Sequence, residues 1–249
     1  MNMQIIHYDA SLIGLSYLIA VLGSYTALQL AIAIPAAEYR STVLGWVTGA
    51  AVALGGGAIW SMHFIGMNAA DMGMPVSYDP LLTVLSLVIG IVASGFGLLM
   101  VGRGEGRTGN LIVGGVVTGL GVALMHYTGM AAMIMPAKVS YDTPLFILSI
   151  VIAIAAATVA LWLAFNLRGN LQRFGSAIVM GIAVCGMHYT GMFALRMQHM
   201  EGAMPAGRAV SSWLASSMSY LVFGVSAALL LLLLLYGAWK SERMLADEF

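Results

Sequence analysis

The chain has 249 residues, of which 61% are hydrophobic and only 8% are charged. Soluble domains carry about 25% charged residues, so this composition excludes an ordinary water-soluble fold. Ten basic residues balance ten acidic ones and form no basic block, which excludes a typical nucleic-acid-binding protein. The single cysteine, Cys185, excludes an internal disulfide.

Seven long apolar segments make up most of the chain, and every Asp, Glu, Lys and Arg lies between or outside them. A membrane-spanning helix needs about 20 apolar residues. The segments are too long for strands and show no alternation of apolar and polar side chains, so helices are predicted. We expect an all-α integral membrane protein with seven transmembrane helices, at residues 10–34, 45–67, 81–101, 111–134, 144–166, 174–195 and 212–239.

The basic residues of the loops predict the orientation, because Lys and Arg are enriched on the cytoplasmic side of membrane proteins. If the N-terminus lies on side one, the basic residues of side two are Arg40, Arg103, Arg107, Arg168, Arg173, Lys240 and Arg243. Those of side one are Lys138, Arg196 and Arg208. This bias predicts an outer N-terminus and a cytoplasmic C-terminus.

One six-residue motif occurs three times, near the ends of the second, fourth and sixth segments. Its copies are Met62-His63-Phe64-Ile65-Gly66-Met67, Met125-His126-Tyr127-Thr128-Gly129-Met130 and Met187-His188-Tyr189-Thr190-Gly191-Met192. A Tyr-Asp pair opens each unit, at Tyr8-Asp9, Tyr78-Asp79 and Tyr141-Asp142. Such self-similarity indicates repeated supersecondary units packed about an axis.

The chain therefore reads as one domain over residues 1–240, followed by a cytoplasmic tail or the start of a linker at 241–249. Within the domain we expect three two-helix repeats, at about 8–70, 77–134 and 140–200, plus a seventh helix. Glycines crowd the even-numbered helices. Because small residues let helices approach closely in lipid, we place these helices as an inner ring.

Each motif offers an imidazole and a thioether on one helix face, since residues four apart share a face. The candidate metal ligands are His63, His126, His188, Met67, Met130 and Met192. Three ionisable side chains at equivalent depth in a membrane are costly and are usually functional. Imidazole together with thioether favours copper, and Cu(I) especially.

Other interpretations of these residues stay open. Methionines also serve as flexible packing in membrane helices, and a buried histidine can simply bridge two helices. Asp9, Asp79 and Asp142 are candidate helix N-caps, or partners for the second ring N–H of a ligating histidine. Cys185, three residues before His188, is a candidate soft ligand or a small buried apolar residue.

The sequence Met-His-Tyr-Thr at 125–128 and 187–190, with its variant Met-His-Phe-Ile at 62–65, resembles the signature of the MHYT domain family. The resemblance covers about residues 8–240. It implies a sensor domain of the bacterial inner membrane, of a kind commonly fused to GGDEF and EAL domains, which make and degrade cyclic di-GMP, or to histidine kinases. It also implies copper bound by the motif Met and His residues and the sensing of a diatomic gas: oxygen, carbon monoxide or nitric oxide. Phe64-Ile65 departs from the pattern, so equal roles for Tyr127 and Tyr189 do not carry over to the first copy.

Our leading hypothesis is a copper-binding sensor of a diatomic gas (oxygen, carbon monoxide or nitric oxide) or of redox state. It would relay the signal through the seventh helix to a cytoplasmic output such as cyclic di-GMP turnover. This chain itself is not expected to be an enzyme. The expected partners are the lipid bilayer, the gas, an output domain of GGDEF/EAL or kinase type in the same or another chain, and a second copy in a homodimer, but no nucleic acid.

Two alternatives belong to other classes of protein. One is an intramembrane zinc hydrolase with three histidine ligands, and the other is a copper uptake protein. The clustered methionines disfavour zinc, which has no need of thioethers, and no ladder of methionines continues to the cytoplasmic side. Copper is therefore the expected cofactor, ahead of haem or zinc.

Overall fold

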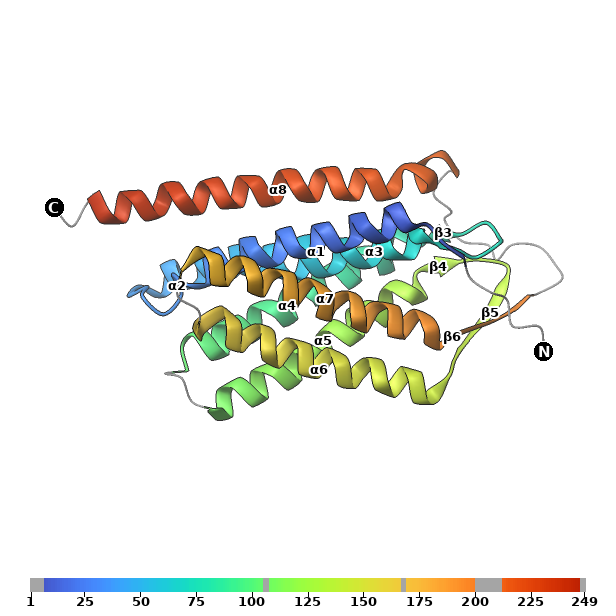
Figure 1. Ribbon diagram of the computed structural model, residues 1–249, viewed down its shortest axis with the longest axis horizontal. Helices are drawn as coiled ribbons and strands as arrows, with labels where there is room; N and C mark the ends of the chain where they lie inside the picture. Colours follow the sequence, from blue (N-terminus) through green and yellow to red (C-terminus); the bar gives the residue numbers. More distant parts are fainter. Residues whose placement is uncertain (1–6, 105–107, 167–168, 200–211, 247–249) are drawn as a thin grey trace.

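Seven helices run alongside one another in the computed structural model, which describes residues 7–104, 108–166, 169–199 and 212–246 (Figure 1). Within the described residues, seven helices are long and apolar enough to cross a membrane, so the predicted fold class is confirmed. Six are α1 (Ala10–Ala31), α4 (Pro80–Gly102), α5 (Thr108–Ala131), α6 (Thr143–Asn166), α7 (Asn170–Ala194) and α8 (Ser212–Ala246).

The remaining span is longer than predicted and has an irregular middle. It covers residues 40–69 rather than 45–67, and consists of α2 (Arg40–Ala51), the π-helix η1 (Val52–Trp60) and α3 (Ser61–Ala69). A π-helix of nine residues is unusual, because most are single-turn bulges. η1 contains the run Gly55-Gly56-Gly57, whose missing side chains allow neighbouring helices to approach the wider backbone.

Three short antiparallel ribbons, which the sequence analysis did not predict, close one end of the bundle. They pair β1 (His7–Tyr8) with β2 (Ala70–Asp71), β3 (Ser77–Tyr78) with β4 (Met133–Ile134), and β5 (Ala137–Tyr141) with β6 (Leu195–His199). Each ribbon therefore joins the strand that enters a repeat to the strand that leaves it. The predicted helix 111–134 ends at Ala131 for this reason, because its last residues lie in β4.

The aspartate of each Tyr-Asp pair caps the first helix of its repeat. Asp9 Oδ1 accepts hydrogen bonds from the backbone N–H groups of Ser11 and Leu12. The Ser11 hydroxyl, which also donates to this carboxyl, and then these N–H groups hold the pKa of Asp9 below its usual value. Asp79 and Asp142 accept one backbone N–H each, from Leu82 and Leu145.

The same aspartates also tie each repeat together through their backbones. The N–H groups of Asp9, Asp79 and Asp142 donate to carbonyl oxygens at the end of the second helix of the same repeat, all at 2.8 Å. In addition, Asp142 forms an ion pair with Arg196, at 3.1 Å. Among the described residues, no hydrogen bond connects these carboxylates to the motif histidines.

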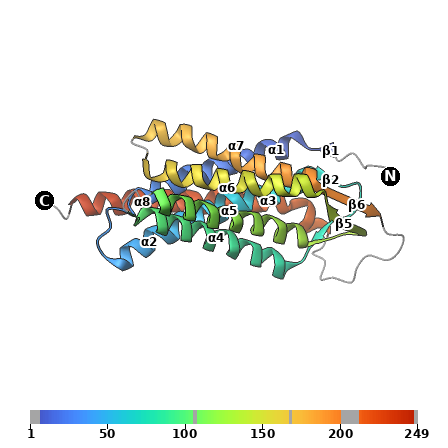
Figure 2. The same ribbon diagram turned by 90° about the horizontal axis from the view of Figure 1, so that it is seen from below.

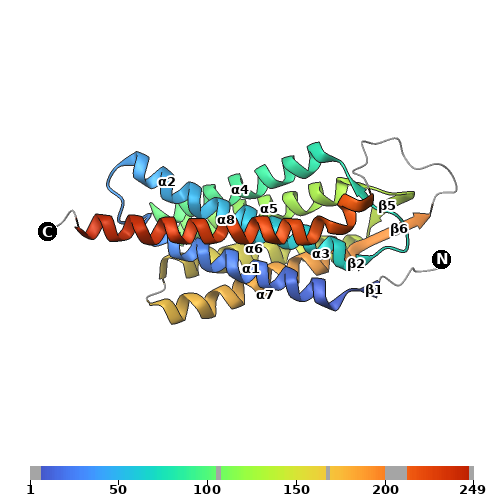
Figure 3. The same ribbon diagram turned by 90° about the horizontal axis from the view of Figure 1, so that it is seen from above.

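The helices form a single closed ring in which first and second helices alternate, so the expected separate inner ring of even-numbered helices is wrong. α1 packs against α7 and α3, α4 against η1 and α5, and α6 against α5 and α7. Figure 2 shows α5, α6 and α7 on one side of the molecule, and Figure 3 shows α8 along another, where it packs against α1, α3 and η1. The ends of α3, α5 and α7 that carry the motifs meet inside this ring.

Candidate metal centre

The three motif histidines (His63, His126 and His188) meet on the axis of the bundle. Each is at most 1% exposed, and they come from α3, α5 and α7. Their Nδ1 atoms point at one another. The distances are 3.1 Å between His63 and His126, 3.1 Å between His63 and His188, and 3.4 Å between His126 and His188. The predicted convergence of the three repeats is therefore present at the level of single atoms.

Hydrogen bonds among the three rings cannot satisfy all three Nδ1 atoms at once. A neutral imidazole carries one N–H, and an N–H placed between two rings points at only one acceptor. With the protons on Nε2 instead, three lone pairs face each other in a dry interior, which is unfavourable unless a positive charge lies between them. This donor set therefore suits a cation.

The spacing of the nitrogens also suits a metal ion. Imidazole nitrogens bind zinc at about 2.0–2.1 Å, and three ligands at that length lie roughly 3.3–3.6 Å apart in tetrahedral or trigonal arrangements. The observed separations of 3.1 to 3.4 Å lie close to this range. Within the described residues, these histidines form the one group of three or more His, Cys, Asp or Glu side chains placed to hold an ion.

The outer edge of each ring rests on a glycine of another repeat. The glycine of each motif faces the Nε2 atom of a neighbouring histidine: His63 lies against Gly129, His126 against Gly191, and His188 against Gly66. A Cβ on Gly66 would lie 2.5 Å from Nε2 of His188, and the other two positions are tighter still. The three Nε2 atoms are buried and lack hydrogen bonds of regular geometry. The motif glycines therefore make the space in which the rings stand.

A second interlocked ring surrounds the histidines and is built from aromatic side chains. The tyrosine of each Tyr-Asp pair packs edge-to-face on the aromatic residue of another repeat's motif. The pairs are Tyr8 with Tyr189, Tyr78 with Phe64, and Tyr141 with Tyr127, with ring centroids 5.9, 5.4 and 5.2 Å apart. Each repeat is thus attached to the next, and the third is attached to the first.

The entry tyrosines stay uncharged near neutral pH. Burial raises the pKa values of the Tyr8 and Tyr78 phenols, and burial together with the nearby Tyr127 raises the pKa of Tyr141 to about 12. Because an apolar environment disfavours the phenolate, these rings add no negative charge beside the histidines.

Three serines that sequence reasoning missed complete the arrangement. Each lies seven residues after the aspartate of a Tyr-Asp pair: Ser16, Ser86 and Ser149. Each hydroxyl donates to the carbonyl three residues earlier at 2.7 Å, so its oxygen is free to accept a second hydrogen bond. The Tyr189 hydroxyl lies 3.1 Å from that of Ser16, and the Tyr127 hydroxyl lies 2.6 Å from that of Ser149. The signal was present, because serine occupies this position in all three repeats.

The first repeat reaches the same arrangement with a different residue. Phe64 has no hydroxyl to offer Ser86, and the indole Nε1 of Trp60 donates to Ser86 at 3.1 Å instead. Trp60 packs against Phe64 in a tilted arrangement, with ring centroids 4.8 Å apart. The departure of the first motif from Tyr-Thr is therefore compensated one turn earlier on the same helix.

Cys185 occupies the position of the third repeat that corresponds to Trp60, three residues before the histidine. Its side chain is partly buried. The structure does not include Cys185 in the group that could hold a metal ion, which contains histidines alone.

The three motif methionines predicted as ligands come together beyond the histidines, on the side of the ribbons. Met67, Met130 and Met192 are at most 2% exposed. They belong to one buried apolar cluster, together with Phe64 and Tyr78. The thioethers therefore lie in a layer next to the imidazoles, toward the same end of the bundle.

We predict that the motif glycines are sterically required, and α7 offers a matched pair to test this. Gly191→Ala places a Cβ against His126, and overpacking of this kind costs about 1–3 kcal/mol. Gly186→Ala, one and a half turns earlier, meets nothing within 4 Å and should leave stability unchanged or raise it by up to about 1 kcal/mol. Thermal unfolding in detergent measures both. Equal melting temperatures for the two variants would contradict the close packing of Gly191 against His126.

The chain is similar in sequence to several bacterial signalling proteins. The chain is 42% identical over 236 residues to the "bifunctional diguanylate cyclase/cyclic di-GMP phosphodiesterase MucR" of Pseudomonas aeruginosa, covering 92% of the chain and 34% of that protein. It is 38% identical over 205 residues to the "signaling protein YkoW" of Bacillus subtilis, covering 80% and 25%. It is 32% identical over 252 residues to the "cyclic di-GMP phosphodiesterase NbdA" of P. aeruginosa, covering 97% and 31%.

The chain thus spans about a third or less of the length of these curated relatives. No solved structure matches it. The family model described as "Bacterial signalling protein N terminal repeat", MHYT, matches three times, at residues 56–114, 119–177 and 181–245. These matches cover most of the chain and include all three motif histidines, so the protein belongs to the MHYT family of bacterial signalling proteins.

Proposed function

We propose that this chain is a copper-binding sensor module that detects a diatomic gas or a change of redox state and relays it to a cyclic di-GMP output. The observation that carries the proposal is the buried triangle of three Nδ1 atoms on the bundle axis. Two of the relatives are named for making or degrading cyclic di-GMP, which supports the choice of output.

The surroundings of the triangle favour copper over zinc. Three neutral imidazoles suit either metal, but the adjacent layer of three buried thioethers suits copper, and Cu(I) in particular. Among the described residues, no carboxylate belongs to the histidine group, whereas catalytic zinc sites often pair histidines with a carboxylate that ligates or acts as base. A copper ion held by these residues would supply a redox-active centre able to bind oxygen, nitric oxide or carbon monoxide.

The protein's own contribution is to fix the three rings and to keep water away. The motif glycines let each imidazole edge lie against the backbone of another repeat, and the three aromatic contacts between repeats hold neighbouring repeats together. Because the three side chains belong to three helices, a change in their spacing must move helices relative to one another. Closely packed interiors pass such movements on rather than absorb them.

One helix is placed to carry that movement out of the bundle. α8 packs against α1, α3 and η1, outside the ring of six (Figure 3). Ser226 on α8 hydrogen-bonds at 2.6 Å with Ser61, two residues before His63, and both hydroxyls are buried. Leu230 lies against Gly57 of η1. The helix of His63 is therefore coupled directly to α8, which extends beyond the predicted span to Ala246.

We predict that copper binding depends on the histidines more than on the methionines. Single replacement of His63, His126 or His188 by alanine should lower copper affinity by about a hundredfold, or about 2.7 kcal/mol, because no other histidine replaces the lost ligand. Single Met→Ala changes at 67, 130 or 192 should cost less and should weaken Cu(I) more than Cu(II), because they remove soft ligands.

The measurement is competitive titration of both oxidation states, after elemental analysis of protein purified without added metal. His7→Ala, an exposed histidine on β1, is the matched control and should leave the affinity unchanged. Retention of zinc instead of copper would favour the hydrolase alternative. Methionine variants that lose as much affinity as histidine variants would show that the site is not anchored by histidine.

We also propose that the ribbon end of the bundle faces outward and that α8 leads into the cytoplasm. Lys138 and Arg196 lie on the ribbons, whereas Arg40, Arg103 and Arg173 lie at the opposite end. Lys and Arg favour the cytoplasmic side. Arg107, Arg168 and Arg208, which also entered the prediction, lie outside the described residues.

Cysteine labelling tests this orientation in a Cys185→Ala background. A membrane-impermeant maleimide applied to intact cells should label Asp71→Cys, at the exposed end of β2. It should label Tyr39→Cys, which is 73% exposed at the other end of the bundle, only after the membrane is permeabilised. The reverse pattern would overturn the proposed topology.

A further inference from the structure

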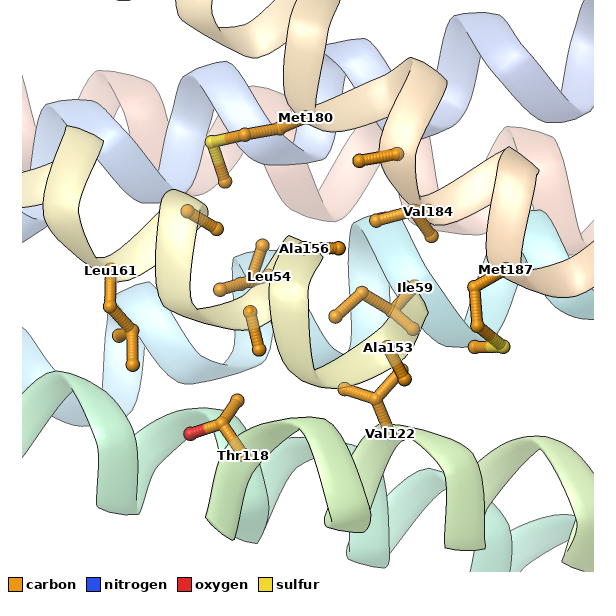
Figure 4. Close-up of a pocket in the computed structure, with 13 residues that line it drawn as sticks. Leu54, Ile59, Thr118, Val122, Ala153, Ala156, Leu161, Met180, Val184 and Met187 are labelled. Atoms are coloured by element: carbon orange, nitrogen blue, oxygen red, sulfur yellow. The ribbon is translucent and has the colours of Figure 1, made fainter. Parts of the chain in front are cut away.

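An apolar cavity lies inside the ring of helices, between η1, α5, α6 and α7. Its volume is about 40 Å³, and Figure 4 shows the side chains around it. A cavity needs roughly 10–15 Å³ to hold one water molecule, so this one has room for a small molecule of two or three atoms.

The cavity lies directly beneath the three imidazoles. Three of its lining residues, Ile59, Val122 and Val184, each stand four residues before a motif histidine. Residues four apart share a helix face, so these three side chains point toward the bundle axis, as the histidines do, but one helical turn farther from the ribbons. The cavity that they line is therefore next to the histidines along the axis. Met187, adjacent to His188 in the chain, also lines it (Figure 4).

The lining offers nothing that would hold water. Thr118 carries its one side-chain hydroxyl, and that hydroxyl donates to the carbonyl of Ala93 at 3.2 Å. A buried water molecule needs two to four polar partners, and apolar cavities without them stay dry and bind apolar guests such as xenon. The chemistry of the cavity therefore selects small apolar molecules.

Part of the cavity lining on α6 and α7 is not fully buried. This part consists of small, partly exposed side chains, among them Ala156, Ala160 and Ala183. The surface around the seam between α6 and α7 is apolar, with Trp162 of α6 48% exposed and Ile182 of α7 59% exposed. α8 does not cover it, because it packs on α1, α3 and η1.

We propose that this cavity is a binding site for a diatomic gas, which enters from the bilayer between α6 and α7 and collects beneath the three histidines. Oxygen, nitric oxide and carbon monoxide are small and apolar and dissolve in hydrocarbon, whereas water and ions do not. The role of the gas rests on the proposed sensor function, but the capacity of the cavity to bind a small apolar molecule does not.

Xenon tests that capacity in protein without copper. The full chain would carry ¹³C-labelled alanine methyl groups, and spectra would be recorded with and without xenon. The methyl groups of Ala153 and Ala157, which line the cavity, should shift with a saturable dependence on xenon pressure. Those of Ala20 and Ala50, which are also buried but lie outside the lining, should not shift. Equal responses at all four methyl groups would overturn the proposal. It would also be overturned if Ala153 and Ala157 contact water or lipid chains and xenon does not displace these molecules.

Substitutions on α6 give matched variants. Ala157→Leu fills the cavity and should weaken xenon binding by about tenfold or more, whereas Ala155→Leu places the same side chain on the exposed face of α6 and should leave binding unchanged. Should Ala157→Leu fail to fold, Leu161→Ala enlarges the cavity and should strengthen the xenon response; a response that stays the same would contradict the assignment.

In copper-loaded protein, Ala157→Leu should slow the reaction with carbon monoxide by about tenfold while copper content stays equal to that of Ala155→Leu. An unchanged rate would show that the gas reaches the histidines by another route. A protein that binds xenon but no copper would refute the sensor function while leaving the cavity site intact.

Discussion

The architecture depends on placing three imidazole rings in a space from which water is excluded. Each ring is wide, yet their Nδ1 atoms stand 3.1 to 3.4 Å apart on the bundle axis. Helices can carry such rings toward a common point only if the next helix leaves room beside each ring. The motif glycines leave that room, and each serves the histidine of a different repeat. In each motif the glycine follows the histidine by three residues. This spacing has its effect only when the three repeats are assembled, because each glycine makes room for the histidine of another repeat.

The three repeats are equivalent around the histidines but not around the whole bundle. Within the described part of the chain, only the first repeat contains a π-helix. The first repeat also replaces the motif tyrosine by Phe64 and contacts α8 through Ser61 and Gly57. A site with three equivalent repeats would contact three equivalent neighbours. Because a single helix, α8, leaves the bundle, one repeat must differ from the other two in order to contact it. π-helical segments often occur at functional positions. Here the segment precedes His63 and meets the helix that leaves the bundle.

Sequence reasoning predicted the seven helices, the three repeats and the meeting of the histidines because long apolar segments and a repeated motif are visible in the sequence itself. It missed the ribbons, since strands of two residues such as Ser77–Tyr78 leave no alternation to detect. It placed the start of the second span five residues late, because hydropathy falls near Arg40 although the helix continues. The pairing of Trp60 with Ser86 was also out of reach, because it depends on which helices are neighbours. The cavity could not be predicted, because it depends on the packing of four helices whose small side chains leave the space between them unfilled.

The ribbons have a mechanical consequence. They fasten the two helices of every repeat at one end, and within the described residues no ribbon lies at the opposite end, so each helix can tilt about the end that its ribbon holds. On α7, His188 lies roughly 10 Å from the ribbon and the far end of the helix roughly 38 Å from it, at 1.5 Å per residue. A tilt that displaces the imidazole by half an ångström thus displaces the far end by nearly four times as much, and small changes of distance at the centre become large enough to alter contacts at the distant face.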